Sequence, residues 1–294
     1  MSAKTEEHGE DRRKNGQLYV VATPIGNLQD IGLRALSVLR AADLVAAEDT
    51  RTTSVLLEHH GIRARLLALH EHNEGKAAAA VLAALGEGRD VALVSDAGTP
   101  AVSDPGAQLV ARAREADFRV IPIPGPNAAV AAVSAAGLAQ AGFVFEGFLP
   151  PKRAARRAAI ERLSGERRPV VLYEAPHRVL ECVEDLAALL GGERAIVIAR
   201  ELTKVFEQIH RCRLDAAAEW LRADPHRQKG EFVIIVEGAP AEESERDPAA
   251  IDRVLRALLD ELPLAQAVRL SCAITGAKRN AVYARALELS GKKV

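Results

Sequence analysis

The chain has 294 residues, of which 48% are apolar, 27% charged and only 3% aromatic, and its formal net charge is −1. This length supports two separately packed domains, and the balanced charge limits any nucleic-acid affinity to local basic patches. No apolar stretch approaches the ~20 residues of a membrane span, and segment 1–16 is unlike a signal peptide, so we expect a cytoplasmic protein without membrane contact. Three widely spaced cysteines indicate neither a disulfide framework nor a zinc site.

The first half of the chain alternates short apolar runs with helical patterns. Segment 1–16 is expected to be a disordered tail, and Asp30 is expected to cap the first helix. Buried strands are expected at Leu18–Ala22, Asp43–Ala47, Leu66–Leu69, Val91–Val94 and Arg119–Ile123. This alternation predicts a mostly parallel sheet, whose ligands bind beyond the carboxyl ends of the strands.

The second half changes character after the turn Pro124–Asn127 and a helical run at 128–136. Strand patterns follow at 142–148, 169–173, 194–199, 205–212 and 231–237, with only two long helical patterns among them, at 154–163 and 177–190. Strand runs 194–199 and 205–212 have no helix between them, which predicts an antiparallel pair in a mixed sheet. The predicted domains are an N-terminal α/β lobe (17–124), a C-terminal α/β lobe (125–238) and a linker with a helical extension (239–294).

The loop Ser95–Gly106 follows a predicted strand and precedes a helical pattern. Glycines let backbone N–H groups approach a ligand closely at such a place. The loop contains Asp96 and Asp104 but no lysine or arginine, and the chain has neither a phosphate-binding G-x-x-x-x-G-K-[ST] loop nor a G-x-G-x-x-G fingerprint. The pattern favours a compact, cationic ligand such as S-adenosylmethionine; a tight turn rich in helix-capping residues is the alternative.

A polar cluster, Glu48–Thr53, follows the second predicted strand. In the functional interpretation its carboxylates act on a ligand, and Arg51 either holds them or contacts phosphate. In the structural alternative, Asp49 or Thr50 caps the following helix and pairs with Arg51. The sequence leaves both interpretations open.

Eight short blocks occur along the chain in a fixed order: Leu18–Leu28, Ala47–Arg51, Ser95–Gly106, Pro124–Pro126, Glu146–Pro150, Tyr173–Arg178, Ala199–Lys204 and Gly230–Glu231. Together they resemble the 16S ribosomal RNA (cytidine-2′-O)-methyltransferases of the tetrapyrrole methylase superfamily, from about residue 17 to 289. The resemblance implies a two-lobed α/β fold with a mostly parallel N-terminal sheet, a mixed C-terminal sheet and an RNA-contacting helical extension. It also implies S-adenosylmethionine as cofactor, a homodimer, and methylation of a cytidine ribose 2′-hydroxyl in 16S rRNA of the small ribosomal subunit.

The resemblance implies that three turns hold the cofactor, at Ile25, at Ala97, Gly98, Thr99 and Val102, and at Asn127 and Ala128. The second lobe is expected to line the adenosine site with Tyr173, Glu174 and Ala175. Tetrapyrrole enzymes usually carry Gly-Gly-Asp where this chain has Ala97-Gly98-Thr99. Asp96 is therefore our candidate for holding the methionine ammonium group.

Glu48 and Asp49 are the candidate catalytic residues, with Glu48 as the general base that takes the proton of the ribose hydroxyl. His70 and His72 lack a third clustered ligand, so we expect an RNA-contacting loop there and no metal site. The candidate RNA contacts are Arg51, His70, Lys152, Arg153, Arg156, Arg157, His177, Arg178, Lys204, Lys278 and Arg279. A solvated helix face is the alternative for the cluster 152–157. Because aromatic residues are few, phosphate contacts and RNA shape are expected to outweigh any broad stacking platform.

Two alternatives come from other functional classes. A small-molecule methylase of the tetrapyrrole type would need a roomy apolar trough, which the basic cluster at 152–157 and the basic C-terminal segment disfavour. A non-catalytic ribosome-binding factor would keep the fold without binding S-adenosylmethionine.

Overall fold

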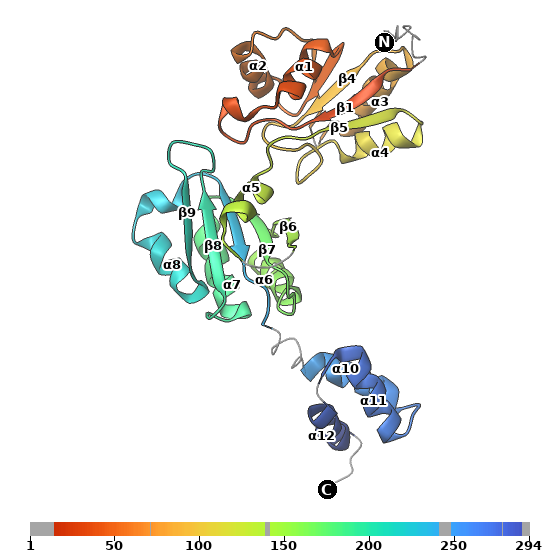
Figure 1. Ribbon diagram of the computed structural model, residues 1–294, viewed down its shortest axis with the longest axis vertical. Helices are drawn as coiled ribbons and strands as arrows, with labels where there is room; N and C mark the ends of the chain where they lie inside the picture. The colour runs from red at the N-terminus through yellow and green to blue at the C-terminus, as the bar shows by residue number, and fades with distance from the viewer. Residues whose placement is uncertain (1–14, 71, 139–141, 241–247, 278, 290–294) are drawn as a thin grey trace, which may run out of the picture. The chain divides into compact units, whose positions relative to one another are not determined.

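The computed structural model describes residues 15–70, 72–138, 142–240, 248–277 and 279–289 (Figure 1). The expected disordered tail lies almost wholly outside the described residues. The chain divides into two compact units, the first formed by Met1–Ser134 and Glu201–Gln208 and the second by Ala135–Arg200 and Ile209–Val294. The division differs from the predicted lobes in giving Glu201–Gln208, from the second half of the chain, to the first unit.

The first unit contains a five-stranded sheet in the order β3-β2-β4-β1-β5, and its strand pairs are parallel. The strands are β1 (Gln17–Val21), β2 (Leu44–Ala47), β3 (Leu66–Ala68), β4 (Val91–Val94) and β5 (Arg119–Ile123). The helices are η1 (Leu28–Asp30), α1 (Leu33–Ala41), α2 (Thr50–His59), α3 (Glu74–Gly86), α4 (Ala107–Glu115) and α5 (Ala128–Ala135). The parallel sheet predicted from the apolar runs is confirmed.

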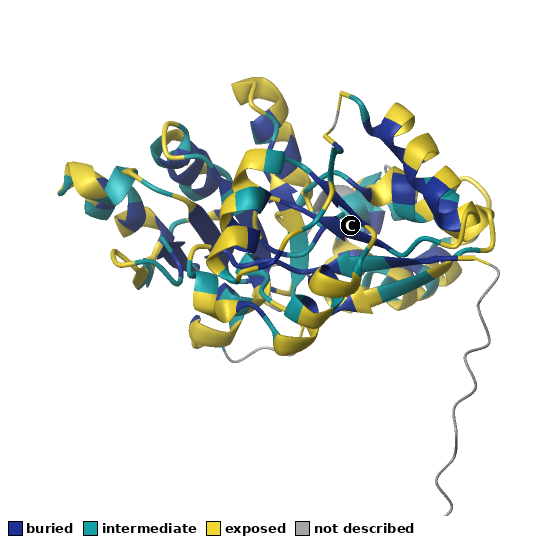
Figure 2. Ribbon diagram, turned by 90° about the horizontal axis from the view of Figure 1, so that it is seen from above, coloured by how far each residue is buried: buried dark blue, intermediate teal, exposed yellow. Residues whose placement is uncertain are grey.

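Helices cover both faces of this sheet. Leu18 packs with buried residues of α3 and α4, whereas Val21 packs with those of α1 and α2. This alternation follows from the two-residue period of a strand, and Figure 2 shows that burial follows the strands and the inner sides of the helices. Neighbouring strands β1 and β4 connect in opposite directions, to β2 through α1 and to β5 through α4. Their carboxyl ends therefore form the topological switch point, where ligands of open α/β sheets bind.

The start of the first helix differs from the prediction. Asn27, and not Asp30, is the capping residue: its side chain accepts a hydrogen bond from the backbone N–H of Gln29 at the start of η1. Asp30 lies inside this short turn, and α1 begins only at Leu33 after Gly32. The expectation that Asp30 caps the helix is therefore wrong, because α1 starts two residues later than expected and its capping position is Gly32, which makes no side-chain hydrogen bond.

The second unit contains a mixed sheet in the order β6-β7-β10-β8-β9. Strand β6 runs parallel to β7, whereas β10 pairs antiparallel with both β7 and β8. The strands are β6 (Val144–Phe148), β7 (Val170–Glu174), β8 (Ala195–Arg200), β9 (Gln208–Arg213) and β10 (Phe232–Val236). The helices are α6 (Arg153–Arg162), α7 (Val179–Leu190), α8 (Leu214–Arg222) and η2 (Pro225–Gln228). The predicted mixed sheet is confirmed.

Two elements of this unit differ from the sequence prediction. Helix α8 was not predicted, although Leu214, Ala217 and Leu221 are buried at helical spacing and pack in the same core as α6 and α7. Strand β9 begins at Gln208 and not at Val205. The chain before it turns instead, because the backbone N–H of Thr203 donates to the Glu207 carboxylate at 2.6 Å.

Three helices follow at the C-terminal end: α10 (Pro248–Leu259), α11 (Leu264–Thr275) and α12 (Arg279–Leu289). They share a small apolar core that includes Leu255, Val268 and Val282. Helix α11 ends at Gly276, whose φ of 70° is the left-handed conformation that glycine adopts readily. Among the described residues, the helices are too short or too polar to cross a bilayer.

A cluster of three arginines around the buried carboxylate of Asp185 joins α6 to α7. The side chains of Arg156 and Asp185 are both 1% exposed, and their ion pair measures 2.9 Å. Arg153 and Arg157 donate to the same carboxylate at 3.3 and 2.9 Å. Burial alone would raise the pKa of Asp185, but the hydrogen bonds from the three guanidinium groups outweigh burial and hold it below 3.8.

We predict that Asp185→Ala destabilises the second unit by about 3–5 kcal/mol, because it removes the buried partner of the Arg156 charge and leaves it only the exposed Glu181 carboxylate at 3.2 Å. Urea denaturation at neutral pH measures this free energy of unfolding. Replacing both partners by apolar residues, as Asp185→Leu with Arg156→Met, should cost less than Asp185→Leu alone. A double variant that is less stable than the single variant would contradict this role.

Candidate functional site

Hydrogen bonds bring together the three turns that follow β1, β4 and β5. Thr23 and Gly98 pair through their backbones, with N–H to O distances of 2.8 and 3.0 Å. The Thr23 hydroxyl also donates to the carbonyl of Ser95 at 3.1 Å. The Thr99 hydroxyl donates to the carbonyl of Pro126 at 3.1 Å. The predicted cofactor turns therefore form one assembly at the β1/β4 switch point.

Gly98 is the centre of this assembly. Its φ of 83° lies in the left-handed region, which side chains other than glycine rarely adopt. A Cβ atom there would lie 3.5 Å from the Ile25 Cγ2 atom and 3.9 Å from the Pro126 carbonyl oxygen. Gly98 thus meets residues from the other two turns, and its backbone conformation lets the three approach one another.

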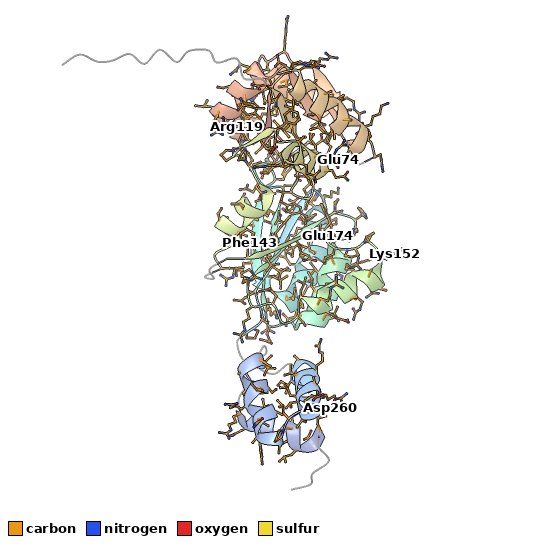
Figure 3. All side chains as sticks on the ribbon, turned by 90° about the vertical axis from the view of Figure 1, so that its right-hand side faces the viewer. Glu74, Arg119, Phe143, Lys152, Glu174 and Asp260 are labelled. Carbon is orange, nitrogen blue, oxygen red and sulfur yellow. The ribbon has the colours of Figure 1, made fainter. Side chains whose placement is uncertain are left out.

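The far end of the same loop is held by a buried carboxylate. Glu74, at the start of α3 (labelled in Figure 3), accepts hydrogen bonds from the backbone N–H groups of Gly106, Gln108 and Leu109 at the start of α4. The carboxylate satisfies N–H groups that have no partner inside the helix, and its negative charge suits the helix dipole. Between the two anchored ends, Ala101 and Ser103 also have positive φ values, 66° and 64°. The loop conformation therefore depends on contacts at both of its ends.

Carboxylates surround this end of the sheet. The backbone N–H of Asp96 donates to the Glu48 side chain at 3.2 Å, and the backbone N–H of Asp49 donates to the Asp96 side chain at 3.0 Å. These bonds join the ends of the adjacent strands β2 and β4. Burial, aided by the neighbouring negative charges, raises the pKa of Glu48 and of Asp96.

Asp49 has the structural role that the sequence left open. Its side chain caps α2 by accepting the backbone N–H of Arg51, and it also binds the Arg51 guanidinium at 2.5 Å. The side-chain hydrogen bond from Arg51 lowers the pKa of Asp49 to about 2. A carboxylate with so low a pKa is a weak base, so the general-base proposal falls on Glu48.

Asp104 belongs to the same group of carboxylates but was not among the predicted site residues. Burial raises its pKa to about 6, and the negative charges of Glu48 and Asp96 add to this effect, against a lowering by a hydrogen bond with Ser95. The sequence signal was its position in the loop Ser95–Gly106. What could not be inferred was that the loop folds back toward Glu48.

The segment Glu201–Gln208 adds Lys204 to the first turn. A Cβ atom on Gly26 would lie 2.6 Å from the Lys204 Cγ atom, so only glycine permits this approach. The Lys204 ammonium pairs with Glu201 at 2.9 Å. Lys204, predicted to contact RNA, thus packs against the turn that contains Ile25.

The remaining cofactor candidates have mixed surroundings. Asn127 caps α5 by accepting the backbone N–H of Val130 at 3.1 Å, and Ala128 is the first residue of that helix. The backbone N–H of Val102 donates to the carbonyl of Thr99 within the loop. Tyr173, Glu174 and Ala175 belong to the second unit, at the end of β7. Their predicted contact with the adenosine stays a prediction.

The candidate RNA contacts in the second unit differ in accessibility. Lys152 is exposed on the outside of the unit (Figure 3), and the side chains of Arg153 and Arg157 are 69% and 36% exposed. Arg156 is 1% exposed and is held by Asp185, so it has no surface to offer to RNA. The Arg178 guanidinium donates to the Leu149 carbonyl at 2.7 Å.

The other candidates lie on separate elements. His177 and Arg279 are exposed, and Lys278 lies outside the described residues. His70 is exposed, and its ring lies 6.2 Å from the ring of His72. Within the described parts of the chain, no three histidine, cysteine or acidic side chains are grouped so that they could hold a metal ion.

We predict that Asp104→Asn removes a pH-dependent loss of stability. Because the folded pKa of about 6 exceeds the ordinary value of 3.8, the folded chain binds more protons than the unfolded chain between these values. The free energy of unfolding of the parent therefore falls as pH rises through this window. Asparagine cannot ionise, so urea denaturation should find the variant more stable than the parent at pH ~7.5 and closer to it at pH ~4. Parallel pH profiles would contradict the raised pKa.

Comparison with protein-family models places most of the chain in one family. Residues 17–218 match the Tetrapyrrole (Corrin/Porphyrin) Methylases, and residues 245–290 match the RsmI C-terminal HTH domain. The solved structure of the methyltransferase CobJ is similar with a TM-score of 0.58 and 20% identity, over 76% of this chain and 95% of that chain. Uroporphyrin-III-C-methyltransferase from Thermus thermophilus is similar with a TM-score of 0.55 and 22% identity, over 76% of this chain and 94% of that chain. These structures share the fold of the first two sheets.

Two curated relatives match nearly the full length. Ribosomal RNA small subunit methyltransferase I of Escherichia coli O157:H7 is 51% identical over 97% of this chain and 100% of its own length. The enzyme of the same name from Pseudomonas aeruginosa is 50% identical over 94% of this chain and 99% of its own length. With the matched domains, these identities show that the chain belongs to the ribosomal RNA small subunit methyltransferase I family of the tetrapyrrole methylases.

Proposed function

We propose that this protein transfers a methyl group from S-adenosylmethionine to the 2′-hydroxyl of a cytidine ribose in 16S rRNA of the small ribosomal subunit. The observation that carries the proposal is the assembly of three turns at the β1/β4 switch point, surrounded by carboxylates. The names of the relatives support the RNA substrate. Location in the cytoplasm and a homodimeric state are further proposals that follow from the resemblance.

The residues of the first unit fit S-adenosylmethionine. Gly98 lies beside Ile25 and Pro126 and adopts a left-handed backbone conformation that favours glycine, which leaves its backbone groups accessible to a ligand. Asp96 is exposed as a residue, but partial burial of its carboxylate and the nearby charge of Asp49 raise its pKa. A cationic group beside Asp96 would therefore relieve unfavourable negative charge. When bound, S-adenosylmethionine supplies a methyl group on a positively charged sulfur, which is a good leaving group. A solved relative in fold was crystallised with S-adenosyl homocysteine, which supports the same ligand class.

Glu48 supports the chemistry by accepting a proton. The ribose hydroxyl is a poor nucleophile while protonated, and a positioned general base contributes roughly a factor of a hundred to ten thousand. The Glu48 carboxylate lies at the carboxyl end of β2, and burial raises its pKa toward the range where a carboxylate is a more effective base. Glu48 would accept the proton that the hydroxyl loses on methylation, and the methyl donor would leave as S-adenosylhomocysteine. Alignment of the attacking oxygen supplies the remaining catalysis.

The RNA is proposed to contact cationic side chains of the second unit and the C-terminal helices. Lys152, Arg153 and Arg157 are accessible at the start of α6, and Arg279 is exposed at the start of α12. The match of residues 245–290 to a helix-turn-helix domain supports nucleic-acid contact there. Such charged surfaces suit phosphates better than the apolar trough that a tetrapyrrole substrate would need.

We predict that Gly98→Val abolishes detectable S-adenosylmethionine binding in isothermal titration calorimetry, because a branched side chain must adopt the left-handed conformation against Ile25 and Pro126. Gly61→Val is the matched control, since Gly61 has a φ of 62° and a Cβ atom added there would meet no atom within 4 Å. The control should bind S-adenosylmethionine like the parent. Near-parental affinity in folded Gly98→Val would remove this loop from the cofactor site. A parent that binds no S-adenosylmethionine would favour the non-catalytic ribosome-binding alternative.

We predict that Glu48→Gln keeps both ligands bound but slows single-turnover methylation by about a hundredfold or more at neutral pH. The loss should shrink as pH rises, because the ribose hydroxyl then ionises without help. Glu58→Gln, an exposed position on α2, is the control and should react at the parental rate. If Glu48→Gln also reacts at the parental rate, alignment alone provides the catalysis.

A further inference from the structure

Three aromatic rings of strands β6 and β7 meet in the second unit. The ring of Tyr173 meets Phe145 edge to face at a centroid distance of 5.0 Å and meets Phe148 in the same way at 5.7 Å. Phe148 is nevertheless 55% exposed, although aromatic residues make up only 3% of the chain. The Phe148 ring thus packs against Tyr173 while much of its surface stays open to solvent.

A bulge in β6 directs Phe148 to this position. Phe145 pairs with Val171 and Phe148 pairs with Tyr173, with the register shift between Phe145 and Gly147. Val171 and Tyr173 are two residues apart and lie on one face of the sheet, so both phenylalanines share that face. In a regular strand, residues three apart would lie on opposite faces. Bulges often re-aim a side chain next to a functional site, and the φ of 71° at Gly147 provides the turn in the chain.

The backbone that follows Phe148 is also fixed. The Arg178 guanidinium donates to the carbonyls of Leu149 and Pro150 at 2.7 and 3.2 Å. Arg178 in turn pairs at 3.2 Å with Glu174, whose side chain is fully buried. Two charged residues from the end of β7 and the start of α7 therefore hold the loop that presents the ring.

Cationic side chains follow the ring closely along the chain. Lys152 is only four residues beyond Phe148, so their Cα atoms lie within about 14 Å. Lys152 is exposed, and Arg153 and Arg157 keep 69% and 36% of their side chains exposed although they contact Asp185. A stacking ring with cations nearby matches the two parts of a nucleotide, an aromatic base and an anionic phosphate.

We propose that the exposed ring of Phe148 stacks on an unpaired base of the RNA substrate, while Lys152, Arg153 and Arg157 bind the flanking phosphates. This inference rests on the proposed function, because it assigns a contact to the same RNA. An RNA base is favoured over the adenine of the cofactor because S-adenosylmethionine has no phosphate to match these cations. One ring is enough for one base, in agreement with the small number of aromatic residues.

The test compares two single-stranded probes of equal length, oligocytidylate and an abasic ribose-phosphate oligomer, by fluorescence anisotropy with the full chain. Stacking on an aromatic residue is lost with the ring, so Phe148→Ala should bind oligocytidylate about tenfold more weakly and bind the abasic oligomer like the parent. Phe148→Leu should show the same loss, and Phe148→Trp should restore binding. Lys152→Gln should weaken both probes equally and flatten the dependence of affinity on salt. Leu33→Ala, at an exposed apolar position on α1, is the control for surface truncation.

Three results would overturn the inference. The first is a Phe148→Ala variant that still prefers oligocytidylate to the abasic oligomer as strongly as the parent. The second is an equal loss on both probes, which would mean a distorted loop and no stacking. The third is a loss of S-adenosylmethionine affinity with unchanged RNA binding, which would assign the ring to the cofactor. Failure of the proposed function would appear separately, as a parent protein that transfers no methyl group to small-subunit rRNA.

Discussion

The backbone pairing of Thr23 with Gly98 is the constraint on which the first unit's site depends. It crosses the switch point between β1 and β4, where the two connections leave the sheet in opposite directions. Together with the hydrogen bond from the Thr23 hydroxyl to the Ser95 carbonyl, it holds the turn after β1 against the loop after β4. The pairing needs a left-handed residue at position 98, which is why a single glycine sets the geometry of Ile25 and the Pro126 carbonyl around it.

The strands and the three turns could be predicted because their signals are local. Continuous apolar runs such as Val91–Val94 identify buried parallel strands, and polar residues at their ends predict the edge of the sheet that offers a ligand site. The same reasoning missed α8. Its buried residues Leu214, Ala217 and Leu221 have helical spacing, but this short pattern lies between two strand patterns. Misplacing the helix cap at Asp30 was also a local error, since Asn27 competes for the same turn.

Long-range pairing explains what sequence reasoning could not reach. The run of basic residues at 152–157 predicted an RNA surface, yet Arg156 is buried because Asp185 lies 29 positions away on the neighbouring helix. For Asp49 the partner is local: Arg51 is only two positions away, so the sequence alone offered it as a partner. The place of Asp104 among the carboxylates could be found only by knowing that its loop folds back toward Glu48. In each case the residue type was evident from the sequence, and its role depended on which element packs against it.

Carboxylates gather at the strand ends of the first unit and cations at the start of α6 in the second unit, as the two ligands of the proposed reaction would require. Burial raises the pKa of Glu48 and of Asp96 at the ends of β2 and β4, and neighbouring carboxylates add to this effect, so a cationic ligand beside them would relieve unfavourable negative charge. A cation bound nearby would lower the pKa of Glu48. In the proposed reaction, burial must therefore keep this pKa high enough for Glu48 to accept a proton. Cations at the start of α6 suit phosphate in the same way. The formal net charge of −1 shows neither the carboxylates nor the cations, because the two signs cancel in the sum. Composition alone would suggest no affinity for either ligand, whereas a few charges placed at strand and helix ends suit the two ligands that we propose.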